Sequence, residues 1–175
     1  MPGRTDRKPI PRKAIALFGA VALLWFLADR ATKAAVDVVR PGTLLVPDVL
    51  GLFEFRLVHN TGAAWGMFGG STVALGVFSL VMCAAIVWFL FALERGGTAL
   101  EGIGLALAFS GGMGNAVDRF AQGYVTDFIN CTFIDFPVFN VADIGVTCGI
   151  ALFFIAWIAA DRGSRPEGGA PGGES

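Results

Sequence analysis

The chain has 175 residues, a common length for one domain. Hydrophobic residues make up 55% of it and charged residues only 15%, against roughly 25% charged in soluble domains, which excludes wholesale disorder and argues against a soluble globule. A net charge of −1, one histidine and three scattered cysteines give no sign of a nucleic-acid surface, a disulfide framework or a zinc site. We therefore expect a membrane protein with no metal, no cofactor and no nucleic-acid partner.

Four apolar runs predict four membrane-spanning helices. They cover residues 14–28, 72–93, 102–117 and 144–160. The second is long enough to cross a bilayer core of about 30 Å, whereas the other three reach across only with their flanking residues. The first run follows basic residues, as a signal peptide does, but no small-residue cleavage site comes after it. We interpret it as an uncleaved first span.

The basic residues predict the orientation of these spans. If both termini and the loop at 94–101 are cytoplasmic, eight Lys and Arg lie inside and five lie outside. This excess follows the positive-inside rule, and it is strongest next to the first span. We expect residues 1–162 to form a single membrane domain and the Gly- and Pro-rich tail at 163–175 to be disordered.

Two long segments, 29–71 and 118–139, then lie on the outer face. Residues 44–58 are rich in β-branched and aromatic residues between turn-forming residues, which predicts a few short strands. The second segment is expected to form a short interfacial helix or a lid. The predicted fold class is a mainly α membrane protein with four spans, a small β-rich platform and this interfacial helix or lid.

Polar residues concentrate beside the third and fourth spans, where ionised carboxylates are costly. Asp127 and Asp143 can approach each other there, share a proton and titrate as a pair. One carboxylate could then accept a proton from water while the other donates one to a carbonyl group, which is the chemistry of an aspartic peptidase. A structural alternative is equally compatible with the spacing. In it Asn140 and Asp143 cap the fourth helix, and Asp118 pairs with Arg119.

Other functions require features that this sequence lacks. His-Glu-x-x-His of zinc peptidases, Gly-x-Ser-Gly of serine intramembrane peptidases and Gly-x-Gly-Asp of presenilin-like enzymes are all absent. A proton or solute relay through Asp118, Asp127 and Asp143 would place carboxylates along the depth of the bilayer. Instead, residues 72–93 and 144–160 carry no charge. A structural scaffold would not require these Asn and Asp residues.

Five motifs, in order along the chain, are similar to those of a known family. They are Asp29-x-x-Thr32-Lys33, His59-Asn60-Thr61-Gly62-Ala63-Ala64-Trp65-Gly66, the string at 111–119, Val125-Thr126-Asp127-Phe128 and Phe139-Asn140-Val141-Ala142-Asp143. The chain resembles the lipoprotein signal peptidases (signal peptidase II) over nearly its whole length outside the termini. The resemblance implies a multi-pass enzyme of the bacterial cytoplasmic membrane. It would remove the signal peptide of a prolipoprotein just before a Cys that carries diacylglycerol.

The resemblance also implies roles for particular residues. Asp127 and Asp143 would be the catalytic pair, at the outer face of the membrane. The residues implied to line the pocket and orient the substrate are Asn60, Asn115, Asp118, Arg119 and Asn140. The expected partners are the lipidated prolipoprotein and membrane lipid, with the enzyme acting as a monomer.

Three further predictions concern the residues around this pair. Gly62 has no side chain and would let substrate or lipid approach the backbone, although a tight turn explains it equally well. Asp29 and Lys33 are spaced i, i+4, which predicts an ion pair that anchors the first helix and contributes a few tenths of a kcal/mol if exposed. We expect Asp29→Asn to lower stability more than turnover. Trp25, like the other tryptophans, is expected to be an interface anchor.

Overall fold

The computed structural model describes residues 12–63, 67–92 and 98–163. Its elements are α1 (Arg12–Val36), β1 (Leu44–Val49), β2 (Phe53–Asn60), α2 (Thr72–Ala92), α3 (Ala99–Ala121), β3 (Val125–Cys131) and α4 (Val141–Gly163). Residues 164–175 of the expected disordered tail, the basic residues before residue 12, residues 94–97 of the predicted loop and Trp65 lie outside the described residues.

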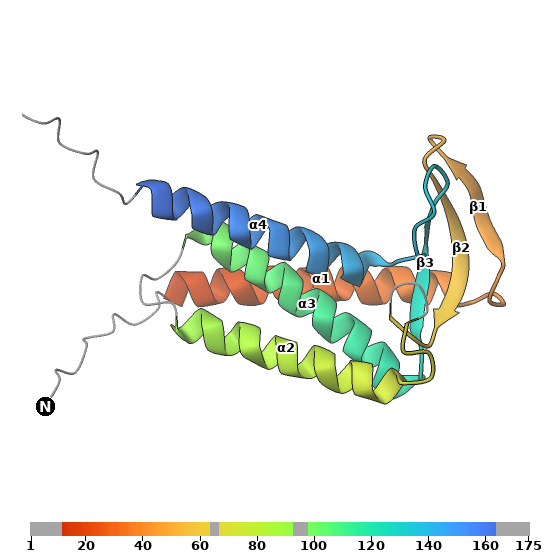
Figure 1. Cartoon of the computed structure of the whole chain (residues 1–175), viewed down its shortest axis with the longest axis horizontal. Coiled ribbons are helices and arrows are strands. Elements are labelled where there is room, and N and C mark those ends of the chain that lie inside the picture. The colour runs from red at the N-terminus through yellow and green to blue at the C-terminus, as the bar shows by residue number, and fades with distance from the viewer. Residues whose placement is uncertain (1–11, 64–66, 93–97, 164–175) are drawn as a thin grey trace, which may run out of the picture.

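The four helices run side by side along the long axis, and the small sheet stands across one end of them (Figure 1). Three helices of the described chain are long and apolar enough to cross a membrane, over Arg12–Val36, Thr72–Phe91 and Val141–Arg162. The remaining helix, α3, contacts all three of the others. The side chains of α3 meet protein on several sides, which explains why this helix is less apolar than the three candidate spans.

Glycine allows α3 and α4 to pack with their backbones close together. A Cβ at Gly104 would lie 2.7 Å from the carbonyl oxygen of Gly149, and one at Gly149 would lie 2.6 Å from the backbone nitrogen of Ala108. A Cβ at Gly111 would overlap the carbonyl oxygen of Ala142. Small residues of this kind are typical of helix contacts inside membranes. The close packing brings the start of α4 against the middle of α3.

Three helices, α1, α3 and α4, extend beyond the apolar runs that predicted them, whereas α2 lies within its run. The first continues to Val36, and α3 begins with a capping box in which Thr98 Oγ1 accepts a hydrogen bond from the Glu101 backbone over 3.2 Å. Glu101 Oε2 in turn accepts a hydrogen bond of 2.8 Å from the Thr98 backbone. The polar string at 29–33 therefore lies near the end of α1, and the string at 111–119 lies in the second half of α3.

The sheet is antiparallel, with the strand order β1-β2-β3. Strands within 44–58 are confirmed, because β1 and the greater part of β2 lie there. The segment 118–139 was expected to form an interfacial helix or a lid, and the helix alternative is wrong. After α3 ends, the segment forms β3 and an extended stretch whose Phe139 bridges to Ile129, and the lid stays a prediction. The β-branched and aromatic residues of 125–129 suit a strand, and β2 supplies a partner edge.

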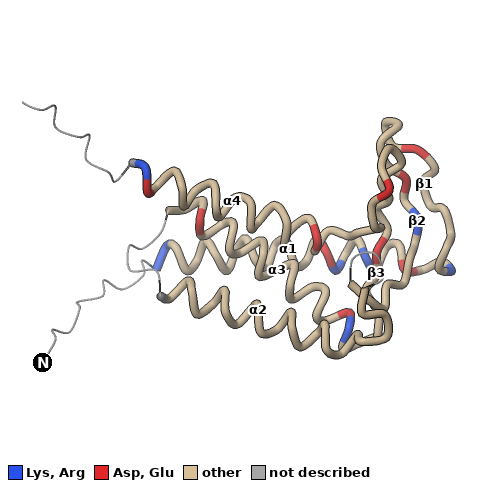
Figure 2. Tube along the Cα trace, viewed as in Figure 1, with Lys and Arg blue, Asp and Glu red and all other residues tan. Residues whose placement is uncertain are grey.

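Charged residues gather at the two ends of the bundle, and a long uncharged stretch separates them (Figure 2). One group lies at the end that carries the sheet. The first described residue of α1 and the last of α4 lie at the opposite end. This distribution is the one expected of a chain whose middle faces lipid.

Candidate active site

The first turn of α4 fixes Asp143. The side chain of Asn140 accepts a hydrogen bond of 3.0 Å from the Asp143 backbone, and Asp143 Oδ2 accepts one of 3.1 Å from the Asn140 backbone. This reciprocal cap confirms the structural interpretation of both residues. It does not exclude a chemical role, because Asp143 also lines a cavity and its Oδ1 accepts a hydrogen bond of 2.7 Å from Asn115.

Strand β3 carries Asp127 into the same region. Asp127 is 2% exposed, and its carboxylate accepts hydrogen bonds from Asn140 Nδ2 at 2.6 Å and from Asn60 Nδ2 at 3.0 Å. Burial, followed by the negative charge of Asp143, raises the pKa of Asp127 to about 7, although the two amide hydrogen bonds act in the opposite direction. Asp127 is therefore poised to exchange a proton near neutral pH.

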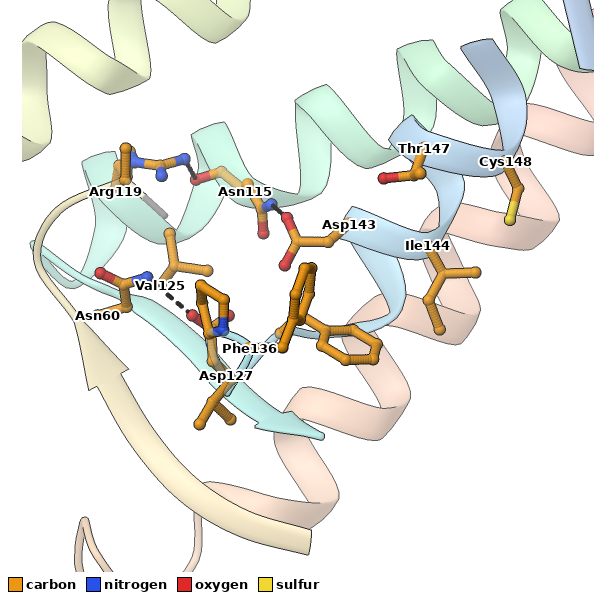
Figure 3. Close-up of a pocket in the computed structure, with 14 residues that line it drawn as sticks. Asn60, Asn115, Arg119, Val125, Asp127, Phe136, Asp143, Ile144, Thr147 and Cys148 are labelled. Carbon is orange, nitrogen blue, oxygen red and sulfur yellow. Dashed lines mark hydrogen bonds between the residues drawn. The ribbon is translucent and has the colours of Figure 1, made fainter. Parts of the chain in front are cut away.

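Both carboxylates line one cavity of about 420 Å³ (Figure 3). Its other lining residues are Asn60, Ala63, Asn115, Arg119, Val125, Phe136, Pro137, Val138, Phe139, Ile144, Thr147 and Cys148. The polar groups lie together near the two carboxylates, and apolar side chains form most of the remaining wall. Two carboxyl groups in one partly dry cavity can act as a proton donor and a proton acceptor toward the same bound molecule.

Arg119 places a positive charge beside this pair. Its Nη2 donates to the Gly62 carbonyl oxygen at 3.3 Å, and its Nη1 donates to the Asn115 carbonyl oxygen at 3.4 Å. The Gly62 backbone nitrogen donates to Asn60 Oδ1 at 2.9 Å, which makes the tight turn that the sequence allowed. Gly62 also lines a second cavity, of about 330 Å³, which shares Asp127 with the first.

A second group of charges lies behind the cavity, and we call it the ion cluster: Asp29, Arg30, Lys33 and Asp118. Lys33 Nζ lies 3.1 Å from Asp29 Oδ1 and 2.7 Å from Asp118 Oδ2. Arg30 Nη2 lies 3.2 Å from Asp29 Oδ2 and 2.6 Å from Asp118 Oδ1. The Asp29–Lys33 ion pair is confirmed, but both side chains are buried, so the small contribution of an exposed pair does not apply.

Two of the residues expected to line the pocket lie outside its lining. Asp118 turns toward α1 and pairs with Arg30 and Lys33 instead of Arg119, and it accepts a hydrogen bond of 3.4 Å from the Thr126 backbone. Asn140 is fully buried behind the two carboxylates. Its contact with both Asp127 and Asp143 accounts for its place in the motif.

Hydrogen bonds connect the ion cluster to the carboxylate pair. Lys33 Nζ donates to Asn115 Oδ1 at 2.9 Å, and Asn115 in turn donates to Asp143. Asp29 Oδ1 accepts a hydrogen bond of 3.0 Å from the Ala142 backbone. The sequence predicted no role for Arg30, which belongs to the ion cluster, and its position next to Asp29 was the one signal that could have found it. It also predicted no role for residues 136–138, which line the cavity.

Comparison with known proteins decides the family. Residues 21–159 match the family described as signal peptidase (SPase) II. The chain belongs to this family. It is 35% identical over 149 residues to the lipoprotein signal peptidase of Latilactobacillus sakei, covering 83% of this chain and 96% of that protein. It is 38% identical over 146 residues to that of Trichormus variabilis, covering 80% of this chain and 88% of that protein.

Solved structures agree with this assignment. A bacterial membrane enzyme matches with a TM-score of 0.78 at 25% identity, covering 94% of this chain and 98% of its own. The resemblance drawn from the five motifs is confirmed. The enzyme is an aspartic peptidase that passes several times through the bacterial inner membrane.

Proposed function

We propose that this enzyme removes the signal peptide from diacylglyceryl-modified prolipoproteins, cutting just before the lipidated Cys, with Asp127 and Asp143 as its catalytic pair. One observation carries the assignment of the pair. The two carboxylates line the same cavity, and Asn140 contacts both, through its side chain to Asp127 and through its backbone to Asp143. The family supports the substrate class, since its curated relatives are lipoprotein signal peptidases.

The reaction needs one ionised and one protonated carboxyl group. The ionised group accepts a proton from water while the water oxygen attacks the carbonyl carbon of the scissile peptide, and the protonated group donates its proton to the carbonyl oxygen. The tetrahedral diol then collapses: the ionised carboxylate takes a proton from one diol hydroxyl as the C–N bond breaks, and the protonated carboxylate gives its proton to the amine of the departing Cys, which restores the pair with one proton. The pKa of Asp127, about 7, suits it to hold the shared proton at the start.

The neighbouring polar groups would orient these reactants. Asn60 and Asn115 each hold one carboxylate by a hydrogen bond of 3.0 and 2.7 Å, respectively, and each lines the cavity. Arg119 also lines the cavity, where its charge would favour an ionised carboxylate and the developing negative charge on the carbonyl oxygen. Hydrogen bonds of this kind count for more in a cavity with few water molecules.

The apolar wall of the cavity suits a lipidated substrate. Ile144, Thr147 and Cys148 continue this wall along α4, and the side chain of Cys148 is exposed on the helix surface. A lipid chain attached to the substrate Cys could therefore lie between the cavity and the lipid around α4. Gly62 would leave room for the peptide in the adjoining cavity.

We also propose four membrane spans, with α3 as the central one. At 23 residues α3 is roughly 34 Å long, enough to cross a bilayer core. The distribution of Lys and Arg supports cytoplasmic termini and an active site at the outer face. Residues 1–162 would form one domain. Both proposed catalytic groups belong to one chain, which supports action as a monomer.

Cleavage of a purified prolipoprotein tests this function. The enzyme in detergent is given the substrate with its Cys either diacylglyceryl-modified or bare, and Asp127→Asn serves as the inactive control. We expect cleavage of the modified form alone, with the new N-terminus at the lipidated Cys by mass spectrometry. No cleavage of either form by folded enzyme would contradict the proposal, and proton flux in liposomes would then support the relay alternative.

A further inference from the structure

Helix α1 holds the start of α4 through two backbone atoms. Trp25 Nε1 donates a hydrogen bond of 3.0 Å to the Val141 carbonyl oxygen, and Asp29 Oδ1 accepts one of 3.0 Å from the Ala142 backbone nitrogen. Trp25 and Asp29 are four residues apart and so lie on the same face of α1. The two backbone groups that they contact immediately precede Asp143.

The surroundings of Trp25 are shaped to its indole ring. A Cβ at Gly145 would overlap Trp25 Nε1 and would lie 2.8 Å from Trp25 Cδ1. Gly145 is one turn after Val141 on α4, so the absence of a side chain there lets the indole reach the Val141 carbonyl group. Trp25 is partly buried, whereas Trp88 and Trp157 are 71% and 50% exposed. Trp25 thus has a protein partner, and the expectation that it is an interface anchor stays a prediction.

We propose that Trp25 is a positioning residue for Asp143: its indole fixes the first turn of α4 against α1 and so directs the Asp143 carboxylate toward Asp127. This inference rests on the proposed catalytic role of the pair. The reciprocal cap with Asn140 fixes Asp143 only within its own turn of helix. The contacts of α1 fix that turn relative to the rest of the bundle, and displacements of about 1 Å at a reacting group cost up to about a hundredfold in rate.

This role predicts a particular kinetic signature. Trp25 lines neither of the two cavities. A substitution at Trp25 should therefore leave substrate binding, and with it KM, unchanged. The charged groups that face Asp127 are Asp143 on α4, Lys33 on α1 and Arg119 on α3. If the first turn of α4 loosens, Asp143 moves away and repels Asp127 less. Loss of the Asn140 hydrogen bond would raise the pKa of Asp127, but the charge of Asp143 has the larger effect, so the pKa falls below its value of about 7.

The experiment compares Trp25→Phe with Trp157→Phe, the same substitution at an exposed site further along α4. For Trp25→Phe we expect kcat to fall about three- to tenfold, the loss typical of one hydrogen bond, at unchanged KM. We also expect the Asp127 limb of the pH–kcat profile to move to lower pH. Trp157→Phe should match the wild type in all three measurements. The folded fraction of each protein is measured by size-exclusion chromatography, and rates are expressed per folded molecule.

A second variant tests the same contact from the side of α4. Gly145→Ala introduces a methyl group where the indole lies and should give the same fall in kcat and the same pH shift. The added methyl group would also lie 3.0 Å from the Leu107 carbonyl oxygen on α3, but its contact with the indole is shared with Trp25, so the double variant should cost less than the sum of the two single losses. Independent losses that add in full would contradict the proposal.

Two failures are distinguishable. If folded wild-type enzyme cleaves no lipidated prolipoprotein, the proposed function is wrong and the positioning role is wrong with it. If the wild type cleaves normally and Trp25→Phe keeps the wild-type kcat and pH profile per folded molecule, the positioning role alone is overturned. The second result would mean that Trp25 contributes to folding only.

Discussion

Two groups of buried carboxylates lie at the same end of the bundle, and their neighbours differ. In the ion cluster, Asp29 and Asp118 each contact both Arg30 and Lys33, at 2.6–3.2 Å. Two positive and two negative charges make the cluster neutral as a whole. Its hydrogen bonds and Coulombic contacts therefore offset the cost of removing the charges from water.

The second group consists of Asp127 and Asp143. Their hydrogen-bond donors are neutral amides: Asn60 and Asn140 for Asp127, and Asn115 and the Asn140 backbone for Asp143. Burial and the negative charge of Asp143 raise the pKa of Asp127 to about 7, and the amide hydrogen bonds, which carry no full positive charge, offset this only in part. The two groups thus differ in their direct partners: cations contact Asp29 and Asp118, whereas amides hold Asp127 and Asp143.

The largest effect should follow from removing either carboxylate of the pair. Asp127→Asn and Asp143→Asn keep the shape of the side chain but cannot share a proton, so we expect cleavage to fall by at least about a thousandfold. Both variants should still insert and fold. The measurement is the cleavage rate of lipidated prolipoprotein per folded molecule. Asp48→Asn, at an exposed carboxylate in β1, is the matched control and should cleave normally. Near-normal activity in either site variant would contradict the assignment.

A change in the ion cluster should act on stability instead. Asp29→Asn keeps an oxygen that can accept the hydrogen bond from Ala142 but leaves the cluster with an uncompensated positive charge. Breaking a buried ion pair in this way costs about 3–5 kcal/mol of unfolding free energy. We expect a lower unfolding midpoint in detergent and a smaller yield, while the cleavage rate per folded molecule changes less than threefold. A loss of turnover with unchanged stability would reverse the two roles.

The pH dependence of stability distinguishes the two groups further. Asp127 has a higher pKa in the folded protein than in the unfolded chain, where it is near 3.8, so the native state binds its proton more tightly. The contribution of Asp127 to the free energy of unfolding is therefore most favourable below about pH 4. It becomes progressively less favourable as the pH rises to about 7. Asp127→Asn removes this penalty. The variant should unfold at a higher temperature than the wild type at pH 8, and the difference should shrink toward pH 4.

The higher stability of Asp127→Asn at pH 8 would show that the wild type gives up stability to keep a catalytic carboxylate, since the more stable variant is inactive. We expect it to amount to a few kcal/mol at most. Asp29→Asn serves as the comparison, because it should be less stable than the wild type at pH 8. If Asp127→Asn is no more stable than the wild type at any pH, the raised pKa of Asp127 is contradicted.

Much of this arrangement could be predicted from the sequence, because lipid imposes simple rules. Long apolar runs must form helices in a membrane. These runs located all four helices to within a few residues, except for the C-terminal end of the first. Asp127 and Asp143 stood out because carboxylates beside apolar runs are rare. Their separation along the chain says nothing about amide partners such as Asn60, which reaches Asp127 only because β2 pairs with β3.

The features that the sequence did not reveal concern contacts between distant segments. Asp29 and Lys33 were recognised as a local pair, but their burial depends on Asp118, which approaches from α3. A tryptophan near the end of a span is typical of an interface anchor. The packing of α1 against Gly145 is what brings the Trp25 indole to the Val141 carbonyl oxygen. A strand at 125–131 was missed because a seven-residue segment acquires its conformation from its neighbour in the sheet.

The smallest effect is expected at an exposed ion pair, which completes the comparison. Arg56 Nε lies 2.9 Å from Glu54 Oε1 on β2, and the Arg56 side chain is 41% exposed. Water and salt screen such a pair, so Arg56→Gln should leave both the unfolding midpoint and the cleavage rate unchanged within error. Lys33→Gln, which removes one cation from the buried cluster, should lower the midpoint in the same assay. If the two substitutions change the unfolding midpoint equally, the buried ion cluster contributes no more to stability than an exposed surface pair.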